Sequence, residues 1–215
     1  MRFEDFERTA LRCFEAIPAE FRVGIDKLVI ERGSRVHPQL PDFFTLGECV
    51  HRDWHPENTP LFSSIHLYFG SFLAVARDDP RFDIPAEIEE TIRHELRHHL
   101  EDRADIPDLA DEDEAAEQNE RRRNALPFRA DFYRLGARID EHAWDVDGDV
   151  FVEIELRRRD AARASGKPLR VRFGPDVLEV DAPATLKDRE FVEVPGGWED
   201  DDGSGGDLFV VIVAR

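Results

Sequence analysis

The sequence has only two cysteines, Cys13 and Cys49, among its 215 residues. Two thiols can form neither a disulfide framework nor a four-thiolate zinc site. Any metal site must therefore use histidine and carboxylate side chains. Cys13 lies among apolar residues at helical spacing, so we expect it in a core.

The chain also lacks any run near the ~18 consecutive apolar residues that a membrane helix needs. Its first ten residues, MRFEDFERTA, have acids where a signal peptide would have an apolar stretch. Acidic residues outnumber basic residues, 48 to 29, and the resulting net charge of −19 would repel nucleic acid and anionic membranes. We therefore expect a cytoplasmic protein whose partners are neither nucleic acid nor membrane.

The residue pattern predicts an α+β fold, with helices and strands in the first half and short strands in the second. Apolar spacing favours a helix over 4–17, and DKLVIERG favours a strand over 26–33. The proline-rich segment 34–61 has little periodicity and is predicted to be loop. Alternation predicts a half-buried strand over 63–70, before a short helix over 71–78. The clearest helix covers 84–102, with Pro85 near its first turn.

The second half has a different character. The charged segment 111–125 has almost no large apolar residues, which predicts a solvated helix or a linker. Residues 111–124 could also form a lid over the cleft. Beyond residue 126, short strand patterns alternate with glycine, proline or aspartate, as in a small all-β sandwich. We predict domains over 1–110 and 126–215, joined by the acidic linker 111–125.

The helix over 84–102 contains the motif His94-Glu95-x-x-His98. At about 100° per residue, Ile88, Ile92, Leu96 and Leu100 share one face, and the two histidines lie on the far side. His99 falls on the packing face, where a buried, hydrogen-bonded histidine is expected.

Two imidazoles one turn apart can bind a single zinc ion at ~2.0–2.1 Å. A glutamate one residue after the first histidine can reach a water on that ion and take its proton. The pattern therefore indicates a Zn²⁺ site with His94 and His98 as ligands and Glu95 as general base.

Residues 3–110 resemble the minimal zincin-like metallopeptidase family. The resemblance rests on AIPAEFR, DKLVIE, SSIHLYFGSFL and HELRHH, in that order. It implies a compact zincin-like α+β domain with the HExxH helix under a short sheet. It also implies that strand 63–70 edges the cleft, where an extended substrate could pair with its main chain.

The chain departs from that family where the third zinc ligand is expected. Family members have small or apolar residues at the positions of Arg93 and Arg97 and glycine at the position of Glu101. Their acid, ten residues after the first histidine, is replaced here by Ala104. We expect Asp105, one residue later, to be the third ligand. The alternatives are Asp102, Glu101, Asp108 and the acids at 111–114.

Two other patterns are weaker. Cys49, His51 and His55 lie close together, but their spacing fits no common zinc module, and we interpret the segment as an irregular loop around Trp54. Residues 145–156 begin like a calcium loop, but Gly148 and Leu156 stand at the wrong positions, so a turn entering a strand is expected.

Residues 126–215 resemble the C-terminal β-domain of DnaJ-type co-chaperones. The resemblance rests on GDVFVEIEL, LEVDAPATLKDREFVEVPGGW and GGDLFVVIV. It implies a scaffold that binds extended or unfolded chains, or that forms a homodimer. The J-domain and the cysteine-rich module of those proteins are absent from the sequence.

We therefore expect a zinc metallopeptidase that hydrolyses peptide bonds and whose β-domain binds peptide or unfolded protein. The alternative is a weakly active or inactive zincin-like module for protein binding or quality control.

Overall fold

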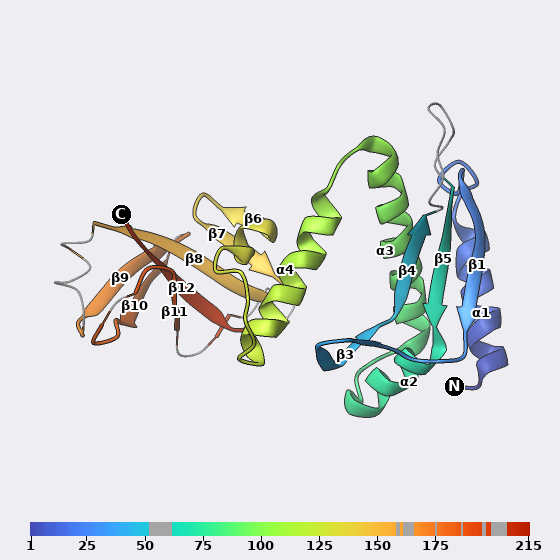
Figure 1. Cartoon of the computed structure of the whole chain (residues 1–215), viewed down its shortest axis with the longest axis horizontal. Helices are drawn as coiled ribbons and strands as arrows, with labels where there is room; N and C mark the ends of the chain where they lie inside the picture. The colour runs from blue at the N-terminus through green and yellow to red at the C-terminus, as the bar shows by residue number, and fades with distance from the viewer. Residues whose placement is uncertain are drawn as a thin grey trace. The chain divides into compact units, whose positions relative to one another are not determined.

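The structure is a computed structural model, and it describes residues 1–51, 62–157, 160, 166–174, 176–185, 187–194, 197–198 and 206–215. The chain folds as two compact units, Met1–Leu109 and Ala110–Arg215. Figure 1 shows the helices of the first unit and the β-rich second unit. Together they make the α+β class that the pattern predicted. In the part of the chain that is described, no helix combines the length and apolarity needed to cross a membrane.

The first unit has helices at both ends of a strand-rich stretch. In chain order its elements are α1 (Phe3–Ala16), β1 (Ile25–Glu31), β2 (Arg35–His37), β3 (Leu40–Thr45), β4 (Gly47–His51), β5 (Ser63–Tyr68), α2 (Phe69–Asp78) and α3 (Ile84–Ala104). The predicted helices and the strands at 26–33 and 63–70 are confirmed. The loop prediction was wrong for 35–51, because β2, β3 and β4 are stabilised by pairing and not by a local pattern. Trp54 and His55 lie outside the described residues.

The main sheet of the first unit has the strand order β1-β5-β4. Strand β5 runs parallel to β1 and antiparallel to β4, with Cys49 opposite Ile65. Strand β5 is therefore central. The expectation that strand 63–70 edges a cleft was wrong, and within the described residues β4 forms that edge. The sequence could not show this, because the pairing partner lies in the segment predicted to be loop.

One face of this sheet carries the core of the unit. Alternation along β5 turns Ile65 and Leu67 inward, where they are fully buried. They pack with Phe6 of α1 and with Ile88 and Ile92 of α3, so both helices cover the same face of the sheet (Figure 1). Burying such side chains stabilises the fold by about 1.5–3 kcal/mol each.

Helix α3 has clear start and stop signals. The Asp83 side chain accepts a hydrogen bond from the Ala86 amide at 3.3 Å, and Pro85 occupies the first turn. The helix ends at Asp105, whose φ of 56° is left-handed. After a short connection, the Glu101 carboxylate accepts a hydrogen bond from the Leu109 amide at 2.8 Å. Glu101 therefore supplies an acceptor for the first turn of the following helix.

The second unit is built on a five-stranded sheet. Its elements are α4 (Asp108–Arg123), a 3₁₀ turn η1 (Phe132–Leu135), β6 (Ala137–Asp140), β7 (Ala143–Val146), β8 (Asp149–Leu156), β9 (Pro168–Phe173), β10 (Asp176–Asp181), β11 (Glu190–Glu193) and β12 (Leu208–Ala214). The sheet order is β11-β12-β8-β7-β6, with β12 parallel to β8. A separate hairpin pairs β9 with β10, and Val171 and Val180 of this hairpin pack on Val150 and Val210 of the sheet.

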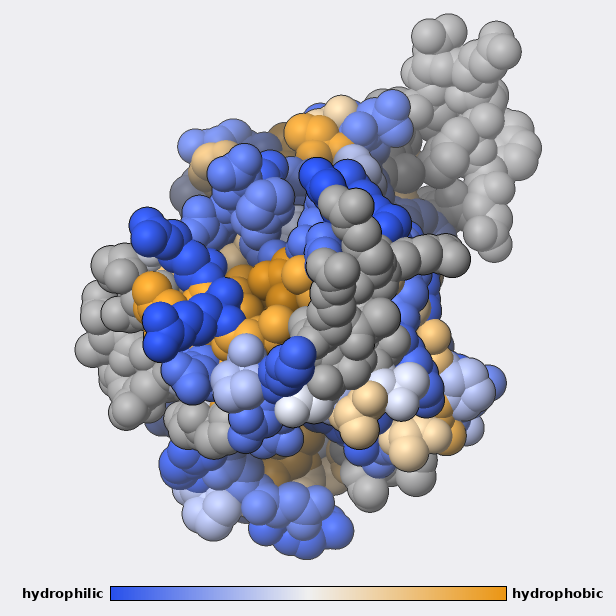
Figure 2. Space-filling model, turned by 90° about the vertical axis from the view of Figure 1, so that its left-hand side faces the viewer, coloured by the Kyte–Doolittle hydropathy of each residue, from blue (hydrophilic) through white to orange (hydrophobic). Residues whose placement is uncertain are grey.

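Apolar side chains are not all enclosed in this unit. Leu156, Leu169 and Leu178 pack on the cluster while remaining only partly buried. Figure 2 shows an apolar area ringed by hydrophilic side chains on the face that it presents.

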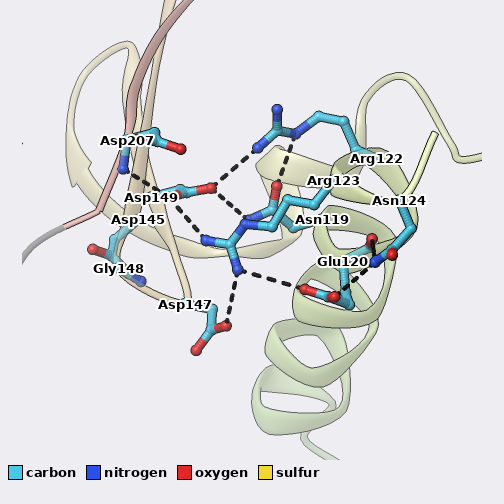
Figure 3. Close-up of polar contacts among 10 residues, drawn as sticks. All are labelled: Asn119, Glu120, Arg122, Arg123, Asn124, Asp145, Asp147, Gly148, Asp149 and Asp207. Atoms are coloured by element: carbon cyan, nitrogen blue, oxygen red, sulfur yellow. Dashed lines mark hydrogen bonds and ion pairs between the residues drawn. The ribbon is translucent and has the colours of Figure 1, made fainter. Parts of the chain in front are cut away.

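The segment predicted as a linker forms most of α4, which packs within the second unit. Ala115 and Asn119 are fully buried on one side of this helix. Asn119 donates to the buried Asp149 at 2.9 Å, and Arg122 and Arg123 contact the same carboxylate at 3.1 and 3.0 Å (Figure 3). A nearly apolar-free helix therefore docks through a buried polar network.

Candidate metal centre

Helix α3 presents two histidines on the side away from its packing face. Ile88, Ile92 and Leu96 are buried, whereas His94 and His98 are only half-buried. The two imidazole rings lie 4.9 Å apart between centroids, at 80° to each other. The angular positions predicted from the sequence are therefore the ones that the helix adopts, and the rings can face one ion.

The two histidines offer a metal two ligands within the first unit. One ring nitrogen of His94 and one of His98 lie within 4.8 Å of each other. The expected third ligand, Asp105, is exposed at the C-terminal cap of α3, and the alternatives at 111–114 belong to the second unit. The third ligand therefore stays a prediction.

The donor set fits zinc chemically. Two imidazole nitrogens and one carboxylate oxygen are the ligands of one class of catalytic zinc site, which leaves a fourth position open.

Glu95 lies beside the edge strand β4 and is 6% exposed. A Cβ atom placed on Gly47 would lie 2.6 Å from Thr91 Cγ2 and 3.0 Å from Glu95 Oε1. Glycine at the start of β4 therefore leaves room for the carboxylate. The sequence analysis did not identify Gly47. The one signal would have been its place at the start of a strand, and that strand was predicted to be loop.

The charged residues that depart from the family pattern point away from the core. Arg93 pairs with Glu89, and Arg97 donates to Glu101 at 2.5 Å. Burial alone would raise the pKa of Glu101, but the hydrogen bonds from the Leu109 amide and the Arg97 guanidinium outweigh it and lower that pKa. Glu101 therefore stays ionised and connects α3 to the start of the next helix.

His99 is a structural residue, as expected. It is fully buried, and its ring nitrogens lie 2.8 Å from Ser63 Oγ and 3.0 Å from the Val23 carbonyl oxygen. Burial lowers the pKa of His99, which keeps the ring neutral.

Neither of the two weaker patterns forms a metal site among the described residues. Burial raises the pKa of Cys49 to about 12, so this thiol does not ionise at neutral pH. His51 contacts Asp102 and Ser63 instead of a metal group. Asp147 and Gly148 form the turn that enters β8, as predicted for the calcium-like segment.

Comparisons with known proteins found similarity among solved structures. No protein-family model matches the chain, and no curated protein matches it. Among solved structures, the chain is similar to a conserved hypothetical protein from Thermo thermophilus, with 36% identity and a TM-score of 0.42. The matched region covers 48% of this chain and 97% of that protein.

Proposed function

We propose that the protein is a zinc-dependent metallopeptidase. The observation that supports this proposal is the pair of half-buried histidines, His94 and His98, one turn apart on α3, with Glu95 one residue from the first histidine. Both histidines and one carboxylate would hold the ion, and the fourth position would remain for water or substrate. A zinc ion bound there supplies a water whose pKa is lowered to about 7.

Glu95 acts as the general base in this proposal. It accepts the proton of the attacking water and passes it to the amine that leaves when the peptide bond breaks. Its burial against β4 excludes competing solvent from the carboxylate, and the lack of a side chain at Gly47 allows the carboxylate to lie close to the strand. Glu95 is therefore held between the metal helix and the strand that would receive substrate.

Strand β4 orients the substrate. Its hydrogen-bonding edge away from β5 is available to an extended peptide among the described residues. A substrate strand added there would lie along α3, because β4 packs on this helix at Gly47. The second unit would bind polypeptide through its partly exposed apolar side chains, which include Leu156, Leu169 and Leu178.

Metal analysis and peptide cleavage test the proposal together. Purified protein should contain about one zinc per chain, and His94→Ala should lose it. Glu95→Gln should keep the zinc and lose cleavage by about 10²–10⁴-fold, the contribution of a general base. Zinc-loaded protein that cleaves no peptide would favour the weakly active binding module, and protein without affinity for zinc would exclude both functions.

The identity of the third ligand has its own matched pair of variants. Asp105→Asn and Asp113→Asn each remove one negative charge. The variant of the third ligand should weaken zinc binding by more than about 100-fold, beyond the 10–100-fold typical of outer-shell changes, and the other variant should leave zinc affinity unchanged. If neither variant weakens zinc binding, neither aspartate is the third ligand.

A further inference from the structure

Arg189 carries an unsatisfied hydrogen-bond donor inside the second unit. Its Nη1 atom is buried, and among the buried side-chain nitrogen and oxygen atoms of the described residues it is the one without a hydrogen-bond partner. The residue as a whole is half-buried, so the rest of its side chain reaches the surface. A buried donor without an acceptor costs free energy, because it has given up its hydrogen bond to water and gained no other.

The backbone at Arg189 is tied to the neighbouring strand. Its amide donates to the Ile212 carbonyl at 2.7 Å, and the side chain of Asp188 accepts from the Ala214 amide at 2.9 Å. These bonds hold Arg189 at a left-handed φ of 56°, which a residue other than glycine adopts at a cost. The base of the arginine side chain is therefore fixed beside β12, just before β11 begins.

The Asp131 carboxylate lies within electrostatic range of Arg189 but is bound to another arginine. Burial would raise the pKa of Asp131, but the hydrogen bond and charge of Arg129, with a smaller effect of Arg189, lower it. Asp131 Oδ1 accepts from Arg129 Nε at 2.9 Å. Within the described part of the chain, Asp131 makes its ion pair with Arg129 and none with Arg189.

The other nearby carboxylate, Glu153 on β8, is also satisfied. It is buried, and it accepts hydrogen bonds from Arg134 Nη2 at 2.6 Å and from the Tyr133 hydroxyl at 3.2 Å. Burial raises the pKa of Tyr133 to about 12, and the positive charge of Arg189 opposes this rise, which places the guanidinium near the same hydroxyl. Glu153 and Arg134 neutralise each other. Arg189 therefore has no counter-ion among the described residues.

Aromatic rings lie close to this unpaired cation. Phe191 follows Arg189 by two residues, and its ring centroid lies 6.0 Å from that of Tyr133 and 5.8 Å from that of Phe128. Phe191 is half-buried, and Phe128 is 37% exposed. A ligand bound to Arg189 would therefore have apolar surface beside it.

These features match a carboxylate better than a phosphate. A guanidinium binds a planar carboxylate through two parallel hydrogen bonds, and one unpaired arginine balances its single negative charge. A phosphate dianion would bring a second charge close to Asp131 and Glu153, on a protein whose net charge is already −19. The aromatic rings favour an apolar group next to the carboxylate.

We propose that Arg189 is the recognition residue of a carboxylate site on the second unit, which binds a small carboxylic acid with an apolar or aromatic group. In the structure Nη1 has no acceptor. Rotation of the long side chain brings the guanidinium to the surface, where it donates two charge-assisted hydrogen bonds to the ligand. Binding is favoured because it removes the cost of the unsatisfied donor. The site needs neither the metal nor the peptidase activity proposed for the first unit.

A titration of the full-length protein with 3-phenylpropionate, followed by amide chemical shifts at constant pH and ionic strength, tests the proposal. The amides of 189–191 and 211–213 should shift and saturate with a Kd of about 1–10 mM, the affinity usual for a ligand of this size. The neutral amide of the same acid, 3-phenylpropionamide, should bind at least about tenfold more weakly. Equal binding of acid and amide, or no saturable shift, would overturn the proposal. Inorganic phosphate that bound as tightly as the acid would overturn the assignment to carboxylates.

Arg189→Asn separates recognition from a structural role. Asparagine tolerates the left-handed backbone and lacks the guanidinium, so the saturable shifts should disappear. Arg170→Asn is the control, because it removes the same charge from a side chain that is 79% exposed on β9 of the same unit, and it should keep the affinity. Without added ligand, the two variants should unfold at similar urea concentrations. An Arg189→Asn protein that unfolds well before the control, or fails to fold, would show that Arg189 supports the fold instead.

Arg189→Lys tests the two-pronged geometry. It keeps the positive charge but cannot donate two parallel hydrogen bonds to one carboxylate, so the acid should bind at least about threefold more weakly than to the wild type. Unchanged affinity would mean that the acid responds to charge alone, which would overturn the proposed recognition by the guanidinium.

Discussion

Asp149 should make a large contribution to the free energy of unfolding of the second unit. Its carboxylate is fully buried and contacts Arg122, Arg123 and Asn119 of α4 (Figure 3). It also accepts a hydrogen bond from the Asp207 amide at 2.8 Å. We predict that Asp149→Ala detaches the C-terminal half of α4 from the sheet.

The magnitude follows from what the substitution leaves behind. Removing one partner of a buried ion pair costs about 3–5 kcal/mol, because the other charge remains buried. The Arg123 side chain is 36% exposed and can reach water, whereas that of Arg122 is 14% exposed and packs over the Phe209 ring. Arg122 therefore carries most of the cost, and we expect a loss of about 3 kcal/mol.

Native-state hydrogen exchange of the β8 and β12 amides measures this loss in the second unit alone. Asp147→Asn is the control, because this side chain is 66% exposed, lies 3.9 Å from Arg123 and sits on a left-handed backbone (φ 52°) that asparagine tolerates. The control should change the free energy of unfolding by less than about 0.5 kcal/mol. If Asp149→Ala differed from the control by less than about 1 kcal/mol, the buried network would not hold α4, and this reasoning would be wrong.

Two further predictions concern packing and ionisation. Gly47→Ala places a methyl group 2.6 Å from Thr91 Cγ2 and should destabilise the first unit by about 1–3 kcal/mol in urea unfolding, whereas Gly33→Ala, with no atom within 4 Å, should be nearly neutral. The two tyrosines of the chain, Tyr68 and Tyr133, have pKa values raised to about 12 chiefly by burial. Their neutral hydroxyls should stabilise the fold below about pH 10, and this stability should be lost between about pH 10 and 12. Ultraviolet absorbance of folded protein should show little tyrosinate at about pH 10.5, and one ionised tyrosine per chain at about pH 10 would contradict the prediction.

Local patterns predicted the elements that local forces form. Helix α3 follows from its apolar spacing and from the capping residue Asp83. Strand β5 follows from alternation, because one of its faces is buried. Strand β4 was missed, because its five residues gain stability from pairing with β5 and show no strong pattern of their own.

The residues of the candidate site also fall into those that a local pattern predicts and those that depend on the tertiary structure. His94, Glu95 and His98 share a helix, and helical geometry relates their directions without reference to the rest of the fold. The third carboxylate could not be chosen from the sequence. Asp105, the expected ligand, is the exposed left-handed cap residue of α3, and the alternatives at 111–114 lie in the second unit.

Composition and periodicity by themselves determined the two-part α+β organisation, the face on which the two histidines lie and the burial of His99. These features depend on neighbours within one or two turns of the chain. Only the tertiary structure decided which strand borders Glu95, why residue 47 is glycine, how a charged helix docks on Asp149 and how one hydroxyl is shared between His51 and His99. Each of these depends on atoms brought together from distant parts of the sequence, and their distances are set by packing that no local pattern records.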